Sequence, residues 1–566
     1  MVSCSRSSGN SPTRPGPALA PERGSVGGLL GIAVFLATPE ERASALTRAF
    51  PERLRYIGGM LIAQLEPPHA THGGDWFYRT HSPGGAMAAH EAVHVVDLVN
   101  THRARDAVLE RADVLILNMV CDPDLLPVIV DRKRRGQATV YEVNDDVAWI
   151  QPWNPTAAFF RNPDNQMLFR LLVRECDAVQ FTCAELARIY GGLNERRRVF
   201  PNQMAHPPRR EASYEPGRQP VIVGWGGSAG HFEDIAAIAP TLVDWARRHE
   251  NVVIHLMCGQ RIASLFSTLD KRQRRIFPTG SIDAYHEFVS GLHIGLAPLE
   301  DTGFNRCRSD VKFLEYALHG VVPVVRDLAP YRDTVRHGET GLLFRDVSQL
   351  PSLLDDLVAD PALCHRLASA AQGYVAAERT EQAHAEARLS FYRELCAPQD
   401  VTREPALFEE LAALQGATRR GRHLSLEPTR YERLLHDALV IGQKPEKRKQ
   451  GVKLLRDAMR LQPHAYQPHL FGCAVATNPL PWLEQALTLN PRSLMARMVL
   501  SGVLADSGNV PGALQHLLKA AETHPGYDLP YLRLGELLVR LGQAEQAREF
   551  LAAAENIRAP CRDVIP

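Results

Sequence analysis

Apolar runs of strand length alternate with amphipathic stretches from residue 75 to residue 344, and this alternation constrains the fold more than any other feature. Segments of helical length and pattern, for example 122–132 and 235–247, separate the apolar runs. Strands that alternate with helices predict parallel sheets with helices on their faces. Residues 27–74 follow this pattern poorly. The predicted strands are residues 76–78, 94–98, 114–117, 138–141, 178–181, 199–200, 221–223 and 252–257.

The length and the changes in composition predict several domains. A chain of 566 residues is too long for one hydrophobic core. The expected fold class is α/β, with two Rossmann-like domains followed by an all-α solenoid. The predicted organisation is a disordered segment at 1–25, a Rossmann-like acceptor domain at 26–205, a linker at 206–219, a Rossmann-like donor domain at 220–396, a second linker at 397–428 and helical repeats at 429–566.

The last 140 residues or so have a repeat of their own. Ala486, Ala520 and Ala554 are 34 residues apart, and Gly508 and Gly542 have the same spacing. Small residues at this period are the signature of tetratricopeptide repeats, in which pairs of helices stack into a solenoid. An ordinary helical bundle is the alternative interpretation. We expect about three repeats.

Composition indicates a globular protein without a strong charge bias. Lys plus Arg and Asp plus Glu both number 64, so no net field attracts nucleic acid or a membrane. The ten cysteines include no CxxC pair, as is typical of free thiols in a reducing cytoplasm. No apolar run reaches the roughly 18 residues of a transmembrane span. The apolar run 27–37 follows several arginines, so a signal peptide is an alternative to a strand there. The expected location is cytoplasmic.

Residues 309–325 carry the most informative motif. Ser309 is a favourable N-cap for a short helix that carries Lys312 and Glu315, and Gly320 ends this helix before a buried strand. A helix N-terminus at the carboxyl edge of a parallel sheet is a common phosphate-binding position.

This motif belongs to a longer region, residues 295–344, that resembles the donor-sugar half of family-4-type glycosyltransferases of the GT-B fold. The resemblance implies two Rossmann-like domains that face each other across a cleft. The matching segments are Gly295-Leu296-Ala297-Pro298-Leu299, Phe304-Asn305, Ser309 to Glu315, Pro330-Tyr331 and His337-Gly338-Glu339-Thr340-Gly341-Leu342-Leu343.

The resemblance also implies roles for individual residues. Glu315 would accept a hydrogen bond from the ribose of a nucleotide sugar, and Arg308 and Lys312 would neutralise its diphosphate beside Ser309. One position departs from the family pattern, because many members carry a glutamate where this chain has Cys307. That glutamate usually helps to hold the sugar, so the identity of the donor stays open.

A glycine turn between a predicted strand and a predicted helix supplies further donor-site candidates. Gly226 and Gly227 allow close backbone approach to a ligand, and Ser228 follows them. Members of the family have a Gly-Ser turn followed by a His and an Asp, matched here by His231 and Asp234. A tight turn with a serine cap is the alternative interpretation.

Two segments of the first domain complete the predicted site. Asp145 and Asp146 follow a predicted strand, where relatives have an acidic pair that faces the cleft. They are candidate catalytic residues that would orient the acceptor hydroxyl or contact the sugar; loop capping is the alternative. No DxD motif between apolar strands is evident, so no metal site is predicted. The segment 79–85 resembles the first glycine-bearing loop of the family. Its candidates are His81 as a catalytic group, with Arg79, Gly84 and Gly85 at the acceptor or the donor phosphate.

These features predict a nucleotide-sugar-dependent glycosyltransferase without a further cofactor. Retention of configuration and metal independence follow from the resemblance alone. The acceptor is a glycan, a lipid-linked sugar or a protein, and the repeats are expected to bind a protein partner or a second copy of the chain. A non-catalytic nucleotide-binding scaffold with a partner-binding tail is the alternative. Donor sugar, nucleobase and oligomeric state stay open.

Overall fold

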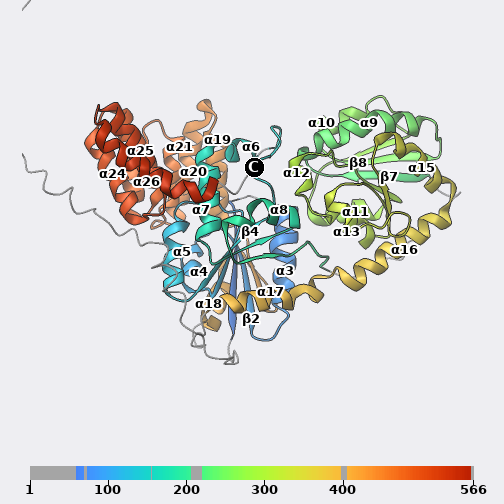
Figure 1. Ribbon diagram of the computed structural model, residues 1–566, viewed down its shortest axis with the longest axis horizontal. Helices are drawn as coiled ribbons and strands as arrows, with labels where there is room; N and C mark the ends of the chain where they lie inside the picture. The colour runs from blue at the N-terminus through green and yellow to red at the C-terminus, as the bar shows by residue number, and fades with distance from the viewer. Residues whose placement is uncertain (1–58, 69–72, 155, 206–219, 397–403, 563–566) are drawn as a thin grey trace, which may run out of the picture. The chain divides into compact units, whose positions relative to one another are not determined.

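The computed structural model describes residues 59–68, 73–154, 156–205, 220–396 and 404–562 (Figure 1). The predicted disordered segment at 1–25, the start of the first domain at 26–58 and the predicted linker at 206–219 lie outside the described residues. Two sheets and a helical region account for the described chain, which confirms the predicted α/β fold class with an all-α C-terminal part.

The first sheet has eight strands, and every pairing except one is parallel. Helices cover both faces: α3 (Ser82–Met87) and α17 (Glu381–Leu395) pack on one, and α5 (Leu125–Arg134) and α7 (Pro163–Glu175) on the other. In spatial order the strands are β13 (Ala417–Arg420), β14 (His423–Leu426), β2 (Val93–Val99), β1 (Met60–Glu66), β3 (Val114–Asn118), β4 (Ala138–Val143), β5 (Ala178–Phe181) and β6 (Arg197–Val199).

Two differences from the predicted strands occur at the start of this domain. The predicted strand at 76–78 is wrong, because these residues form α2 (Gly74–Trp76) and the π-helical turn η1 (Phe77–His81). Aromatic residues favour strands mainly where they fit a half-buried pleated surface. Here the helical turn instead directs Tyr78 and Arg79 into the interior. Conversely, the poorly patterned region contains β1, whose seven residues are all buried, including the polar Gln64 and Glu66 near its end.

The segment 397–428, predicted to be a linker, differs most from expectation. Its described residues form α18 (Glu404–Ala412) and the strands β13 and β14, and β14 pairs with β2 in parallel. Phe408 and Leu424 are completely buried in the first domain. Apolar side chains alternate too briefly here to predict a strand, but the open edge of β2 supplies the hydrogen-bonding partners. This segment therefore completes the first domain.

The second sheet has six strands, all parallel. Its helices include α9 (Phe232–Arg247), α11 (Ile282–Ser290), α13 (Val311–Leu318) and α16 (Pro361–Glu378). After α16 the chain returns to the first domain, where Leu389 and Tyr392 of α17 are buried. In spatial order the strands are β12 (Leu342–Phe344), β11 (Val322–Arg326), β10 (Ile294–Ala297), β7 (Val221–Gly226), β8 (Val252–Met257) and β9 (Arg274–Phe277).

The C-terminal region is helical throughout its described residues and packs against the first domain. Leu494, Ala520 and Tyr527 belong to the same hydrophobic core as the first sheet. Asp124 at the N-terminus of α5 accepts hydrogen bonds from Ser493 Oγ at 2.8 Å and from the backbone N–H of Met495 at 3.0 Å. The helices are α19 (Arg430–Gly442), α20 (Arg448–Leu461), α21 (Gln467–Val475), α22 (Leu480–Leu489), α23 (Leu494–Asp506), α24 (Val510–Thr523), α25 (Asp528–Arg540) and α26 (Ala544–Arg562).

The glycines of the 34-residue repeat lie where two of these helix pairs turn. Gly508 and Gly542 have φ of +84° and +75°, a left-handed conformation that costs glycine little. None of the described helices is both long and apolar enough to cross a membrane.

Candidate functional site

The strand order of the second sheet marks one edge as a ligand site. The chain runs from β7 outward to β8 and β9, and then returns to place β10 on the other side of β7. Ligands of open α/β sheets bind at such a switch point, outside the carboxyl ends of the two strands. Asp234 joins the segments that follow β7 and β10, because its Oδ1 accepts from the backbone N–H of Glu300 at 2.9 Å and from Asn305 Nδ2 at 2.7 Å.

His231 lies at this edge together with two basic side chains. Its Nδ1 is 2.8 Å from Asp234 Oδ2. The pKa of His231 is lowered to about 4. Burial has the largest effect, the charges of Arg308 and Lys312 act in the same direction, and Asp234 opposes them. His231 is therefore neutral at pH 7, donates its Nδ1 proton to Asp234 and keeps Nε2 as an acceptor. The structure brings together three residues that the sequence analysis assigned to the donor site.

Glu315 lies in α13 and is buried within a group of hydroxyl and ammonium donors. Its Oε1 accepts from Tyr78 Oη at 2.7 Å, and its Oε2 accepts from Tyr285 Oη at 2.8 Å and from Lys312 Nζ at 3.2 Å. Burial alone would raise the pKa of Glu315, but Lys312, His286 and the two tyrosine hydroxyls together lower it. The carboxylate is therefore charged at neutral pH.

Arg308 faces acidic side chains of the first domain. Its Nε donates a hydrogen bond to Asn305 Oδ1 at 3.3 Å. Burial raises the pKa values of Asp75 and Asp145, and the positive charge of Arg308 opposes this increase. The pKa of Asp145 reaches about 7, because the charges of Asp75 and Asp146 add to the effect of burial. Asp145 can therefore exchange a proton near neutral pH.

The two predicted catalytic aspartates have different environments. Asp146 is fully buried, and its Oδ1 accepts from Tyr190 Oη at 2.5 Å and from the backbone N–H of Ala148 at 3.0 Å. These contacts match the loop-capping alternative. Asp145 is the partly exposed member of the pair and the one that interacts with Arg308.

Close packing accounts for Gly226, the last residue of β7, and for Gly227, which follows it. A Cβ at Gly226 would lie 2.9 Å from the ring of Tyr285, and one at Gly227 would lie 2.6 Å from the ring of Trp225. Ser228 follows as an exposed N-cap residue, without a side-chain capping bond, of the 3₁₀ turn η3 (Ala229–His231).

The predicted N-cap of α13 is corrected by one residue. The helix begins at Val311, and Asp310 is its N-cap residue. Asp310 is held by Arg379, whose Nη1 donates to Asp310 Oδ2 at 2.6 Å. Ser309 lies one residue earlier and accepts a hydrogen bond from Asn202 Nδ2 at 2.9 Å. Ser309 thus links the two domains.

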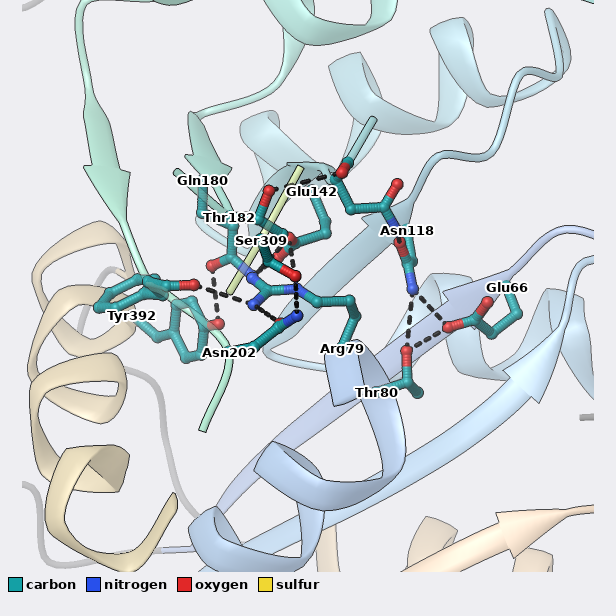
Figure 2. Close-up of polar contacts among 12 residues, drawn as sticks. Glu66, Arg79, Thr80, Asn118, Glu142, Gln180, Thr182, Asn202, Ser309 and Tyr392 are labelled. Atoms are coloured by element: carbon teal, nitrogen blue, oxygen red, sulfur yellow. Dashed lines mark hydrogen bonds and ion pairs between the residues drawn. The ribbon is translucent and has the colours of Figure 1, made fainter. Parts of the chain in front are cut away.

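Arg79 is buried in an ion pair, which differs from its predicted place in a phosphate-binding loop (Figure 2). Its Nη2 is 2.6 Å from Glu142 Oε1, and its Nη1 donates to Asn202 Oδ1 at 2.7 Å. Gln180 Nε2 holds the other carboxylate oxygen of Glu142 at 2.5 Å. These groups point toward one another in Figure 2, and Asn202 in turn contacts Ser309 of the second domain.

The glycines of the same segment lie in α3, which corrects their prediction as a loop. A Cβ at Gly84 would lie 2.5 Å from Gln64 Nε2, and one at Gly85 would lie 3.6 Å from His423 Nδ1. His81 ends the preceding turn, with its ring stacked on Trp76 and its Nδ1 3.6 Å from Asp97 Oδ2. The structure therefore groups His81 with Asp97 and His423.

Sequence reasoning missed a polar cluster at the corresponding switch point of the first sheet, between β1 and β3. Asn118 Nδ2 donates to Glu66 Oε1 at 2.6 Å, and the hydroxyl of Thr80 donates to the same oxygen (Figure 2). Burial raises the pKa of Glu66 to about 7, against the effect of these hydrogen bonds. The available signal was a polar residue directly after each apolar run.

Comparison with known proteins gives one family match and several structural likenesses. Residues 504–564 match the family model for tetratricopeptide repeats. A search of curated proteins finds none that matches the chain.

The structural likenesses are to solved structures of low sequence identity that cover about three fifths of this chain. Anabaena HepE in complex with UDP has 13% identity and a TM-score of 0.43 over 59% of this chain and 100% of its own. Sucrose-phosphate synthase from Thermosynechococcus elongatus has 16% identity and a TM-score of 0.44 over 59% and 99%. A glycosyltransferase from Rickettsia africae has 11% identity and a TM-score of 0.42 over 60% and 98%. At these values the likenesses by themselves define neither fold nor activity.

Proposed function

We propose that this protein is a glycosyltransferase that takes its sugar from a nucleotide-sugar donor bound at the switch point of the second sheet. One observation carries the proposal: Arg308, Lys312 and neutral His231 come together beside a buried carboxylate, Glu315, at the carboxyl edge of β7 and β10. A nucleoside diphosphate needs cationic partners for its phosphates and a carboxylate acceptor for its ribose hydroxyls. This edge offers both.

The transfer step places the same groups in definite roles. The bond between the anomeric carbon and the diphosphate oxygen breaks, and its electron pair leaves with the phosphate. Arg308 and Lys312 stabilise that developing charge, as fixed cations do in a partly dehydrated site. The acceptor hydroxyl oxygen forms the new bond to the anomeric carbon, and its proton passes to a base or to the departing phosphate. Metal independence is carried over from the resemblance of residues 295–344 to family-4-type enzymes.

Asp145 is the group we place on the acceptor side. It lies in the first domain, interacts with Arg308 across the two domains and has a pKa of about 7. A carboxyl group with this pKa can accept a hydrogen bond or a proton from an incoming hydroxyl at neutral pH. Asp146 positions the loop through Tyr190 and Ala148. Retention of configuration is carried over from the resemblance of residues 295–344 to family-4-type enzymes.

The alternative is a non-catalytic scaffold that binds a nucleotide sugar without transferring its sugar. Two features favour it: Cys307 stands where many relatives have a sugar-holding glutamate, and its thiol is buried, 4.0 Å from Asp146. The tetratricopeptide region is compatible with either function, because solenoids of this kind present extended surfaces that bind partners. In both cases we propose a protein partner or a second copy of the chain as its ligand.

Equilibrium binding of nucleotide sugars tests the donor site, and turnover separates the two functions. We expect Arg308→Gln and Lys312→Met each to weaken donor binding about tenfold, the effect of losing one charge-assisted hydrogen bond. Arg306→Gln is the matched control, because Arg306 is exposed and pairs with Asp301. Equal binding by all three variants would contradict the donor site. Binding by the wild type without turnover of any donor or acceptor would favour the scaffold.

A further inference from the structure

Two histidines and an aspartate from three separate elements converge in the first domain. His81 ends η1, Asp97 lies in β2, and His423 begins β14. Each residue offers one ligand atom, and these three atoms all lie within 4.8 Å of one another. His423 Nε2 is 2.7 Å and His81 Nδ1 is 3.6 Å from the same oxygen, Asp97 Oδ2.

The surroundings hold these groups in place and pack closely around them. Gln64 Nε2 donates to Asp97 Oδ1 at 2.8 Å, so the other carboxylate oxygen faces both imidazoles. The helix α3 passes this point with Gly84, where a Cβ would lie 3.0 Å from His423 Nε2. A side chain at this position would therefore collide with the ligand atom, so glycine allows α3 to pack against the cluster. Fixed carboxylates and close second contacts of this kind are typical of metal sites.

The hydroxyl of Ser425 offers a fourth ligand atom beside the two imidazoles and the carboxylate. Ser425 Oγ is 3.3 Å from Asp97 Oδ2 and 3.4 Å from His81 Nδ1. Trp76 stacks on the His81 ring at 4.4 Å and closes one side. Two imidazole nitrogens, one carboxylate oxygen and one hydroxyl or water oxygen form a four-coordinate set that suits Zn²⁺.

From this arrangement we propose that His81, Asp97 and His423 bind a divalent transition-metal ion, most naturally Zn²⁺, at a site separate from the donor site. The ion takes the place of the protons that the two imidazoles otherwise share with Asp97. Arg420 Nη1, which is 3.4 Å from His81 Nε2, then turns toward solvent, where most of this side chain already lies. The proposal does not depend on the proposed transferase function.

The position of the site indicates a structural role. His423 and Ser425 lie in β14, which reaches the first sheet only after the chain has completed the second domain. A metal bound between β14, β2 and η1 would fasten this late segment to the core. Since metal binding to the folded state alone stabilises that state, removal of the ion would lower the unfolding temperature.

The test uses tag-free, full-length protein that has been stripped with a chelator and dialysed. We expect one Zn²⁺ per chain in a competition titration with a chromophoric chelator, and a visible absorption band when Co²⁺ is added instead. The variant His423→Gln should lose at least tenfold in Zn²⁺ affinity, whereas His464→Ala, at an exposed histidine, should bind as the wild type does. Zinc should raise the unfolding temperature of the wild type and of His464→Ala only.

Two results would overturn the site. One is stripped wild-type protein that binds no Zn²⁺ or Co²⁺ stoichiometrically at micromolar concentration. The other is a His423→Gln variant that binds Zn²⁺ as tightly as the wild type. The wild-type titration stands even if the variant fails to fold, so the proposal can be rejected without it. In the absence of a metal, the three residues would be a hydrogen-bonded cluster that joins β14 to β2.

Discussion

The hydroxyl of Tyr78 donates a 2.7 Å hydrogen bond to Glu315, although 237 positions separate the two residues in the sequence. Tyr78 belongs to the first domain, and Glu315 belongs to the second. The carboxylate that we assign to the ribose of a donor is therefore already occupied by a side chain from the opposite domain. Donor binding must either displace this hydroxyl or share Glu315 with it.

Tyr78→Phe removes the competing donor and keeps the ring. We expect the variant to bind nucleotide sugars about two- to tenfold more tightly than the wild type, because one hydrogen bond contributes about 0.5–1.5 kcal/mol. Tyr531→Phe in the helical region is the control, and calorimetric titration is the measurement. Unchanged or weaker donor binding by Tyr78→Phe would mean that Tyr78 does not compete for Glu315.

Asp145→Asn should change the pH dependence of stability. The pKa of Asp145 in the folded protein, about 7, lies above the ordinary value for an unfolded chain. The stabilising contribution of the protonated form is therefore complete below the unfolded pKa and is lost as the pH rises through about 7. We expect the melting temperature of Asp145→Asn, relative to wild type, to increase between pH 4 and pH 7 and to level off above that. A constant difference across this range would contradict the raised pKa.

The buried pair of Arg79 and Glu142 predicts strong coupling between two substitutions. Arg79→Met leaves a buried, uncompensated carboxylate, and removal of one partner from such a pair costs about 3–5 kcal/mol of unfolding free energy. The double variant Arg79→Met/Glu142→Gln should recover part of this loss, because it leaves no unpaired charge. Urea denaturation of the four proteins measures the coupling. Additive losses would mean that the ion pair is not formed.

The helical region should contribute to the stability of the first domain. Asp124→Ala would leave the buried hydroxyl of Ser493 and the N–H of Met495 without the carboxylate that they contact, at a cost of about 1–3 kcal/mol. Asp506→Ala, at an exposed end of α23, should change stability by less than about 0.5 kcal/mol. Equal stability of both variants would show that the repeats do not pack on the first domain in solution.

The sequence could predict those helices and strands that are encoded by the pattern of neighbouring residues. Strands β2, β3, β4 and β5 and the helix that carries Lys312 and Glu315 follow from apolar periodicity and turn residues. The 34-residue spacing similarly predicts the repeats. The central strand β1 was not predicted. Its first four residues, 60–63, are all apolar because the strand is buried on both faces, and this short run does not distinguish a strand from other apolar segments.

Long-range partners account for what the sequence could not predict. Arg79 looks like a loop cation until Glu142 and Asn202 surround it, and Ser309 looks like an N-cap until Asp310 takes that position beside Arg379. His81 meets His423 only because a segment that resembles a linker adds a strand to the first sheet. None of these contacts has a counterpart in local spacing.

The central claim is that Glu315 and its basic neighbours bind and activate a nucleotide sugar. The most direct measurement is nucleotide release from a panel of UDP-, GDP-, TDP- and ADP-sugars, with wild type and Glu315→Gln side by side and their melting curves as a check on folding. We predict slow, acceptor-free hydrolysis of one donor by the wild type. In Glu315→Gln, donor binding should weaken by about 1.5–3 kcal/mol, the range for a hydrogen bond to a charged group. Equal hydrolysis and binding of that donor by a folded Glu315→Gln variant would contradict the account.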